Sequence, residues 1–146
     1  MNDFIEGVMA YLEGSSLTDD FIEAVYLRLV SFGYTPTSAD YWTAAFCCQK
    51  VENHIRNVCN IKTVPEGLYN IAVDRVCGEF LNGLKATGKL NIEGLDLSAA
   101  VTSIKEGDTQ VSFASGGSTA EQFSAFVSYM MSEGEGELIC YRKLRW

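Results

Sequence analysis

One histidine and five cysteines are the residues in this sequence best suited to catalysis or to metal binding. A cysteine beside a histidine can act as an activated nucleophile, and sets of cysteines and histidines hold zinc. If residues 47–54 form a helix, Cys47 and His54 lie about 10 Å apart, which is too far for a nucleophile–base pair. No zinc-binding pattern fits the spacing of Cys47, Cys48, His54, Cys59 and Cys77. We therefore expect no catalytic site, no metal and no cofactor, and predict that the protein is not an enzyme.

The same residues have a structural interpretation. The N-terminal segment is acidic and lacks the basic region of a signal peptide, which favours a reducing cytoplasm over a secreted, disulfide-bonded chain. Reduced cysteines pack as small hydrophobic residues, so we interpret them as core residues. His54 is expected to be partly buried and hydrogen-bonded. Two glycine-containing stretches, residues 113–118 and 134–137, lack a phosphate-binding lysine and are interpreted as a loop hinge and a solvated linker.

The charge of the chain is unevenly distributed. The 146 residues carry a net charge of −8, with 47% hydrophobic and 21% charged residues, a composition typical of one folded domain. No apolar run approaches the length of about 18 residues that a membrane span needs. The last six residues contribute +3 through Arg142, Lys143 and Arg145, which leaves −11 on residues 1–140. Such an acidic body repels phosphate, which disfavours tight nucleic-acid binding by the surface at large.

Helices are predicted over most of the chain. Apolar residues recur at steps of three and four in the segments 2–13, 18–32, 37–60, 63–88 and 118–133. Capping boxes are predicted to begin three of these helices: Thr37 with Asp40, Thr63 with Glu66, where Pro65 occupies the first turn, and Ser118 with Glu121. We expect residues 2–88 to form a helical bundle, to which residues 118–133 add the last helix.

Residues 98–114 alternate between apolar and polar types, which predicts a β-hairpin. Gly107 and Asp108 suit a two-residue turn with glycine first. An isolated hairpin is only marginally stable in water, so this one is expected to lie on the bundle or on another subunit. The predicted fold class is therefore mainly α: a single-domain bundle of four to five helices with one β-hairpin and an extended C-terminal arm.

The arm, residues 134–146, is basic and aromatic at its end. Successive residues of LICYRKLRW alternate in a way that suits an extended segment. Arginine, tyrosine and tryptophan are the residues most enriched as energetic anchors of protein interfaces, and a terminal strand can add to the edge of a partner's sheet. We therefore predict that the arm binds a partner. In the alternative interpretation, Leu138, Ile139, Tyr141 and Trp146 fold back onto the protein's own helices.

The order of these features resembles one family. A long capped helix is followed by VPEGLYNIAVDRVCGEFL, by SIKEGDTQVSF, by a last helix and by the terminal YRKLRW. Over about residues 18–146 this resembles the head–tail connector proteins of long-tailed phages and prophages, also called adaptor or head-completion proteins. The resemblance implies a structural virion protein that forms a ring, typically of twelve copies, between the portal and the stopper or tail. Such a ring extends the DNA channel, and its subunits are made in the cytoplasm of the bacterial host.

The resemblance also implies roles for particular residues. The C-terminal arm of the family contacts the portal, which implies portal binding by Leu138, Ile139, Tyr141, Arg142, Lys143, Leu144, Arg145 and Trp146. The resemblance further implies that hairpin residues contact a neighbouring subunit or line the channel. These residues are Ile104, Lys105, Glu106, Gly107, Asp108 and Thr109. The expected partners are further copies of the chain, the portal protein and a stopper or tail-completion protein, with transient passage of DNA and no membrane.

The residues themselves agree with this interpretation in part. An acidic body suits a channel through which DNA slides without binding, and a head-to-tail interface closes into a ring when its rotation permits. The alternative is a small helical DNA-packaging or regulatory binding protein. A cluster of basic residues on one folded face would favour that alternative.

Overall fold

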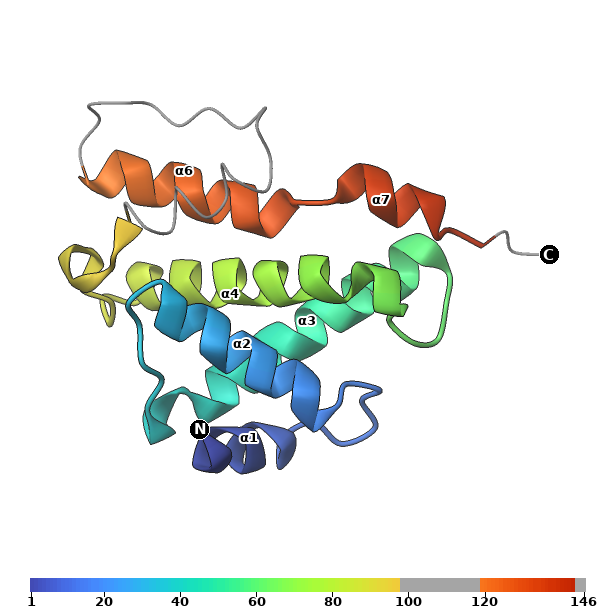
Figure 1. Ribbon diagram of the computed structural model, residues 1–146, viewed down its shortest axis with the longest axis horizontal. Helices are drawn as coiled ribbons and strands as arrows, with labels where there is room; N and C mark the ends of the chain where they lie inside the picture. The colour runs from blue at the N-terminus through green and yellow to red at the C-terminus, as the bar shows by residue number, and fades with distance from the viewer. Residues whose placement is uncertain (98–118, 144–146) are drawn as a thin grey trace.

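The computed structural model describes residues 1–97 and 119–143, and these residues are mainly helical (Figure 1). The helices are α1 (Asn2–Met9), α2 (Asp19–Ser31), α3 (Tyr41–Cys59), α4 (Tyr69–Ala86), α6 (Thr119–Ser132) and α7 (Glu135–Cys140). Short 3₁₀ helices occur at η1 (Ser38–Asp40), η2 (Glu66–Leu68) and η3 (Ile92–Gly94). The predicted helical bundle is confirmed. The predicted hairpin, residues 98–114, and the capping residue Ser118 lie outside the described residues, so both stay predictions.

Helix α4 is at the centre of the bundle. It packs against α2, α3 and α6, while α1 packs across α2 and α3 (Figure 1). Its buried side chains accordingly occupy more than one stripe, as a helix with several neighbours requires. Gly78 brings α6 close, because a Cβ at this position would lie 2.7 Å from the Cβ of Met130. Helix α6 therefore belongs to the same core as the first four helices.

Local sequence signals explain where α3 begins. The capping box of Thr37 and Asp40 is present, and the Thr37 amide donates to the Asp40 carboxylate at 2.8 Å. The Tyr34 hydroxyl donates to the same carboxylate at 2.7 Å. Burial, followed by this hydrogen bond and the charge of Asp40, raises the pKa of Tyr34. The box prediction at Thr37 is therefore confirmed, and the buried Asp40 is fully engaged.

Three other expectations for the helices are wrong. The first helix ends at Met9 rather than near residue 13, and the chain then turns through the residues before Gly14, which has a φ of +75°. The Thr63 capping box does not form, since η2 begins after Pro65 without a side-chain cap. The third error concerns the arm. Its residues Glu135–Cys140 form helix α7 rather than an extended segment.

Helix α7 forms for two physical reasons, one at its start and one on its buried face. Gly134 adopts a φ of +79°, a conformation open to glycine, which lets the chain leave α6 and start a new helical turn. Leu138 is then fully buried, and α7 packs against α3. Burial of a leucine outweighs the weak preference of a short alternating pattern for extended structure. Residues 134–137 are therefore the start of a helix and not a linker, although residues 135–137 are exposed to solvent as expected.

Candidate functional site

The cysteines are placed as structural residues, with one exception. Cys47, Cys48, Cys59 and Cys77 are buried, as predicted, whereas Cys140 is exposed, which the sequence interpretation did not foresee. Burial, with a smaller effect from Glu79, raises the pKa of Cys47 to about 12. At neutral pH this thiol is therefore protonated and a poor nucleophile. Within residues 1–97 and 119–143, no three His, Cys, Asp or Glu side chains are grouped to hold a metal ion.

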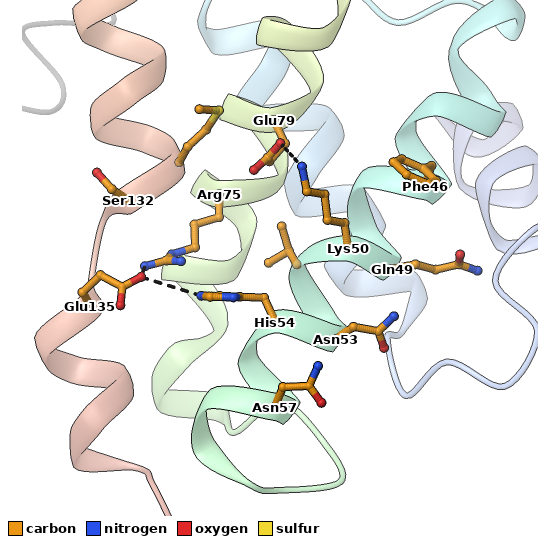
Figure 2. Close-up of a pocket in the computed structure, with 12 residues that line it drawn as sticks. Phe46, Gln49, Lys50, Asn53, His54, Asn57, Arg75, Glu79, Ser132 and Glu135 are labelled. Atoms are coloured by element: carbon orange, nitrogen blue, oxygen red, sulfur yellow. Dashed lines mark hydrogen bonds and ion pairs between the residues drawn. The ribbon is translucent and has the colours of Figure 1, made fainter.

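A pocket opens where α3, α4 and the junction of α6 with α7 meet. It encloses about 580 Å³. Phe46, Val51 and Met131 form apolar parts of its wall, and the side chains of Lys50, His54 and Arg75 enter it from α3 and α4 (Figure 2). Each of these three side chains has an acidic residue near it, so the charges of Lys50 and Arg75 are balanced by neighbours.

Arg75 is the central residue of this pocket. Its side chain is only 5% exposed, although arginine is almost never buried without partners. Its Nε donates to the backbone carbonyl of Glu133 at 2.8 Å, and its Nη2 donates to Oε1 of Glu135 at 2.7 Å. The hydrogen bond from Arg75 holds the pKa of Glu135 below its usual range. One guanidinium therefore fixes both the end of α6 and the first turn of α7.

His54 is more exposed than the partly buried, hydrogen-bonded residue that the sequence predicts. Its side chain is 47% exposed, and its Nε2 lies 3.7 Å from Oε1 of Glu135. That distance is too long for a hydrogen bond, but it places any imidazolium charge beside the carboxylate. A second pair stands across the pocket, where Lys50 Nζ lies 3.0 Å from Oε2 of Glu79. Figure 2 shows Lys50 and His54 leaving neighbouring turns of α3 toward α4.

Glu133 lies at the junction itself, between α6 and α7. Burial, a hydrogen bond with Asp74 and the charge of Asp74 raise the pKa of Glu133 to about 8. Arg28 opposes this shift and Glu137 adds to it. Its Oε2 is buried without a hydrogen-bond partner among the residues described. Glu133 therefore retains a proton near neutral pH, while Asp74 is held by Arg28 Nε at 2.8 Å.

The C-terminal arm docks on the end of α3. Leu138 is fully buried, and its carbonyl accepts a hydrogen bond from Cys59 Sγ at 3.2 Å. The Lys143 amide donates to the carbonyl of Cys59 at 2.7 Å, and Asn60 Nδ2 donates to the Lys143 carbonyl at 3.3 Å. Tyr141 packs against Gly67 of η2, where a side chain would collide with its hydroxyl.

Docking leaves part of the arm exposed. Ile139 is 64% exposed and Tyr141 39% exposed, and Arg142 and Lys143 are also exposed. The fold-back alternative is therefore correct for Leu138 and wrong for Ile139. Leu144, Arg145 and Trp146 lie outside the described residues, as do the hairpin residues Ile104, Lys105, Glu106, Gly107, Asp108 and Thr109.

No protein-family model, curated protein or solved structure matches this chain. Its own geometry shows a pocket that serves a structural purpose, because the pocket's buried arginine anchors the base of the arm. The hydroxyl of Ser132, which also lines the pocket, donates back to the carbonyl of Ser128 at 2.8 Å. Within residues 1–97 and 119–143, this hydroxyl therefore donates to the backbone and not to a side-chain base that could activate it.

Sequence reasoning missed the residues that hold the arm. In the sequence, Arg75 is a polar position within a mostly apolar helical segment. Glu133 and Glu135 belong to an acidic, glycine-containing stretch near the C-terminal arm. A signal was present, since an arginine within a mostly apolar helix face needs an acidic or carbonyl partner. The sequence does not say which of 19 acidic residues that partner is.

Proposed function

We propose that this protein is a structural phage protein, a head–tail connector that forms a ring between the portal and the stopper or tail. In this proposal the ring extends the DNA channel and completes the head, and the C-terminal arm of each subunit binds the portal. The ordered sequence features from the long third helix to YRKLRW motivate the proposal, and a helical bundle is compatible with it.

One observation carries the proposal: the arm presents an exposed apolar and basic surface at the end of an acidic protein. Ile139 is 64% exposed, and Tyr141, Arg142 and Lys143 follow it at the surface. Exposed apolar residues that adjoin one another mark interaction sites, and arginine and tyrosine are common interface anchors. The positive charges also stand out against a net charge of −8, which favours an acidic partner surface.

The arm has a buried part and an exposed part, and the proposal assigns portal binding to the exposed part. Leu138 anchors the arm, because this side chain is completely buried against the bundle. The residues from Ile139 onward carry the exposed groups. A portal could therefore bind the outer surface of the arm without removing Leu138 from the core. Portal contact and the stability of the bundle then depend on different residues, which makes the proposal testable.

The test is binding to purified portal rings from the same phage genome, measured by biolayer interferometry. A chain truncated after Cys140 keeps Leu138 and should remain folded. We expect it to bind portal rings at least about tenfold more weakly than the full chain, since anchor residues each contribute more than about 1–2 kcal/mol. Glu13→Ala, a surface change before the bundle's second helix, is the control and should bind as the full chain does. Undiminished portal binding by the truncated chain would overturn the role of the arm.

A further inference from the structure

Helix α7 is joined to the bundle by few buried contacts. It has six residues, packs against α3 and lies at the edge of the bundle, beyond a break in the chain after α6 (Figure 1). Leu138 is the one buried residue of this helix, and its other residues are exposed to solvent. Segments with few buried apolar contacts and an exposed backbone open at a lower free energy than the core does. Helix α7 is therefore a segment that can leave the bundle by itself.

The core of the bundle does not depend on α7. Helix α6, which precedes α7, has four buried side chains of its own, and it packs closely against α4. These side chains are Phe123, Phe126, Val127 and Met130. Release of α7 leaves their contacts in place, so α6 stays on α4 when α7 moves.

Gly134 separates the part that stays from the part that can move. It is the residue before α7 and adopts a φ of +79°, a conformation open to glycine. Arg75 holds the chain on both sides of this residue, through the Glu133 carbonyl at 2.8 Å and the Glu135 carboxylate at 2.7 Å. Movement about Gly134 breaks only the second of these two bonds, so the end of α6 remains fixed.

The contacts beyond Gly134 depend on one another. A helix of six residues does not persist alone in water, because isolated helices shorter than about 12–15 residues are marginal. Helix α7 therefore exists only while it is docked. Its undocking removes together the carboxylate of Glu135 from Arg75, the carbonyl of Leu138 from the Cys59 thiol, and the amide of Lys143 from the Cys59 carbonyl.

We infer that residues 135–143 form a strap, which opens and closes about Gly134 while the bundle stays folded. Figure 1 shows the closed strap. In the open form, Leu138 and the surface of α3 that it covers become accessible to solvent. The inference goes beyond the proposed function, because it concerns the chain alone and holds whether or not a portal binds. A partner that binds one form better than the other shifts the population toward that form, so the strap is a regulatory device.

Cys59 is a natural reporter of the open form. Its side chain is fully buried, and its Sγ donates to the carbonyl of Leu138 at 3.2 Å, so the strap lies directly on the thiol. Cys77 is fully buried too, but it lies on the central helix α4, with its Sγ 3.8 Å from the carbonyl of Val25 on α2. A thiol reagent reaches Cys59 when the strap opens and reaches Cys77 when the bundle unfolds. Once uncovered, both thiols have an ordinary pKa of about 8.5, so their labelling rates can be compared.

The test labels the full chain with N-ethylmaleimide under native conditions and follows Cys59 and Cys77 by mass spectrometry of their peptides. Cys59 should react at least about tenfold faster than Cys77, because opening of the strap needs less free energy than unfolding of the bundle. Urea well below the unfolding midpoint should accelerate the labelling of Cys77 steeply and that of Cys59 only slightly, since the effect of urea follows the surface that is exposed. Hydrogen exchange at the Lys143 amide should give the same free energy of opening as Cys59 does.

Two matched variants test what holds the strap closed. Glu135→Ala removes the carboxylate partner of Arg75 and should accelerate the labelling of Cys59 by about fivefold. Glu137→Ala makes the same change of charge on the same helix, at an exposed residue, and should leave the labelling rate of Cys59 unchanged.

A third variant destabilises the bundle and not the strap. Ile22 is fully buried on α2, and Ile22→Val should accelerate the labelling of Cys77 by about two- to tenfold while that of Cys59 stays the same. An equal acceleration of both thiols would show that Cys59 becomes accessible only by unfolding of the bundle.

Other results would also overturn the inference. Equal rates and equal urea dependence of Cys59 and Cys77 would mean that the strap opens only with the bundle. Rapid exchange of the Lys143 amide beside a protected Cys59 would mean that residues 135–143 fray and do not open together. Equal labelling of Cys59 in Glu135→Ala and Glu137→Ala would remove Arg75 from the device. No portal is present in these experiments, so their outcome and that of the portal-binding test are independent.

Discussion

Arg75 and Glu135 are joined by a 2.7 Å hydrogen bond between Nη2 and Oε1 across sixty positions of sequence. The arginine is buried and the glutamate is more than half exposed. The same guanidinium holds the carbonyl of Glu133 at 2.8 Å, so it spans the turn at Gly134. The start of the C-terminal arm is therefore determined by a residue in the central helix, and the position of the arm on α3 follows from it.

Glu135→Ala should destabilise the protein. The change removes the carboxylate partner of a buried guanidinium and leaves only the carbonyl bond. A buried donor left without its partner costs about 1–3 kcal/mol, and exposure of Glu135 places the effect toward the lower end. Urea denaturation measures the change. Glu137→Ala on the same helix is exposed and should alter the unfolding free energy by less than about 0.5 kcal/mol. Equal effects of the two changes would contradict the role given to Arg75.

Leu138→Ala should destabilise the protein far more than Ile139→Ala. Leu138 is fully buried, and truncation of a buried leucine costs about 2–5 kcal/mol. Ile139 is 64% exposed, so its truncation should change the unfolding free energy by less than about 0.5 kcal/mol. The portal experiment should show the opposite order, because Ile139 belongs to the exposed surface. Equal stability of the two variants would indicate an arm that is not docked.

The sequence predicted those features that depend on neighbours in the chain. The capping box of Thr37 and Asp40 spans three residues and was found as predicted. The same pattern at Thr63 failed, because the chain runs through Pro65 into a 3₁₀ turn before α4 begins. Local patterns thus predict helices better than they predict the residue at which a helix starts.

The site could not be predicted in the same way. The contact of Arg75 with Glu133 and Glu135 forms only when α4, α6 and α7 pack together. The spacing of residues along the chain does not indicate it. The arm shows the same limit. An alternating segment of six residues is compatible with a strand, and only the burial of Leu138 in the folded protein decides for a helix.

Two glycines on α4 should respond in opposite directions to the same substitution. A Cβ at Gly78 would lie 2.7 Å from the Cβ of Met130, so Gly78→Ala should separate α6 from α4 and cost about 1–3 kcal/mol. Beyond its own helical backbone, no atom of the described residues lies within 4 Å of a Cβ at Gly83, and alanine is favoured over glycine inside a helix by about 0.5–1 kcal/mol. Gly83→Ala should therefore stabilise the protein. Thermal melting distinguishes the two, and a stabilising Gly78→Ala would contradict the close approach of these helices.

The free energy of unfolding should decrease as pH rises through neutrality, because Glu133 then loses its proton. Its pKa is raised from a usual value of 4.5 to about 8 by burial and by Asp74, so the folded state binds this proton more tightly than the unfolded state does. The stabilisation is complete below about pH 4.5 and is lost as pH rises through about 8. The other charged groups facing Glu133 are Arg28, which favours its ionised form, and Glu137, which opposes it.

Glu133→Gln isolates this contribution, because the amide fills the same space without ionising. Unfolding free energies measured by urea denaturation between pH 5 and 7.5 should fall for the wild type and change less for the variant. The range stops below the usual pKa of a cysteine thiol, about 8.5, so the thiols stay largely protonated in both the folded and the unfolded state. Glu137→Gln is the control and should retain most of the wild-type slope, since Glu137 contributes the smallest of the charge effects on Glu133. Identical slopes for the wild type and Glu133→Gln would show that the proton is held elsewhere, and the packing at the junction of α6 and α7 would then not depend on it.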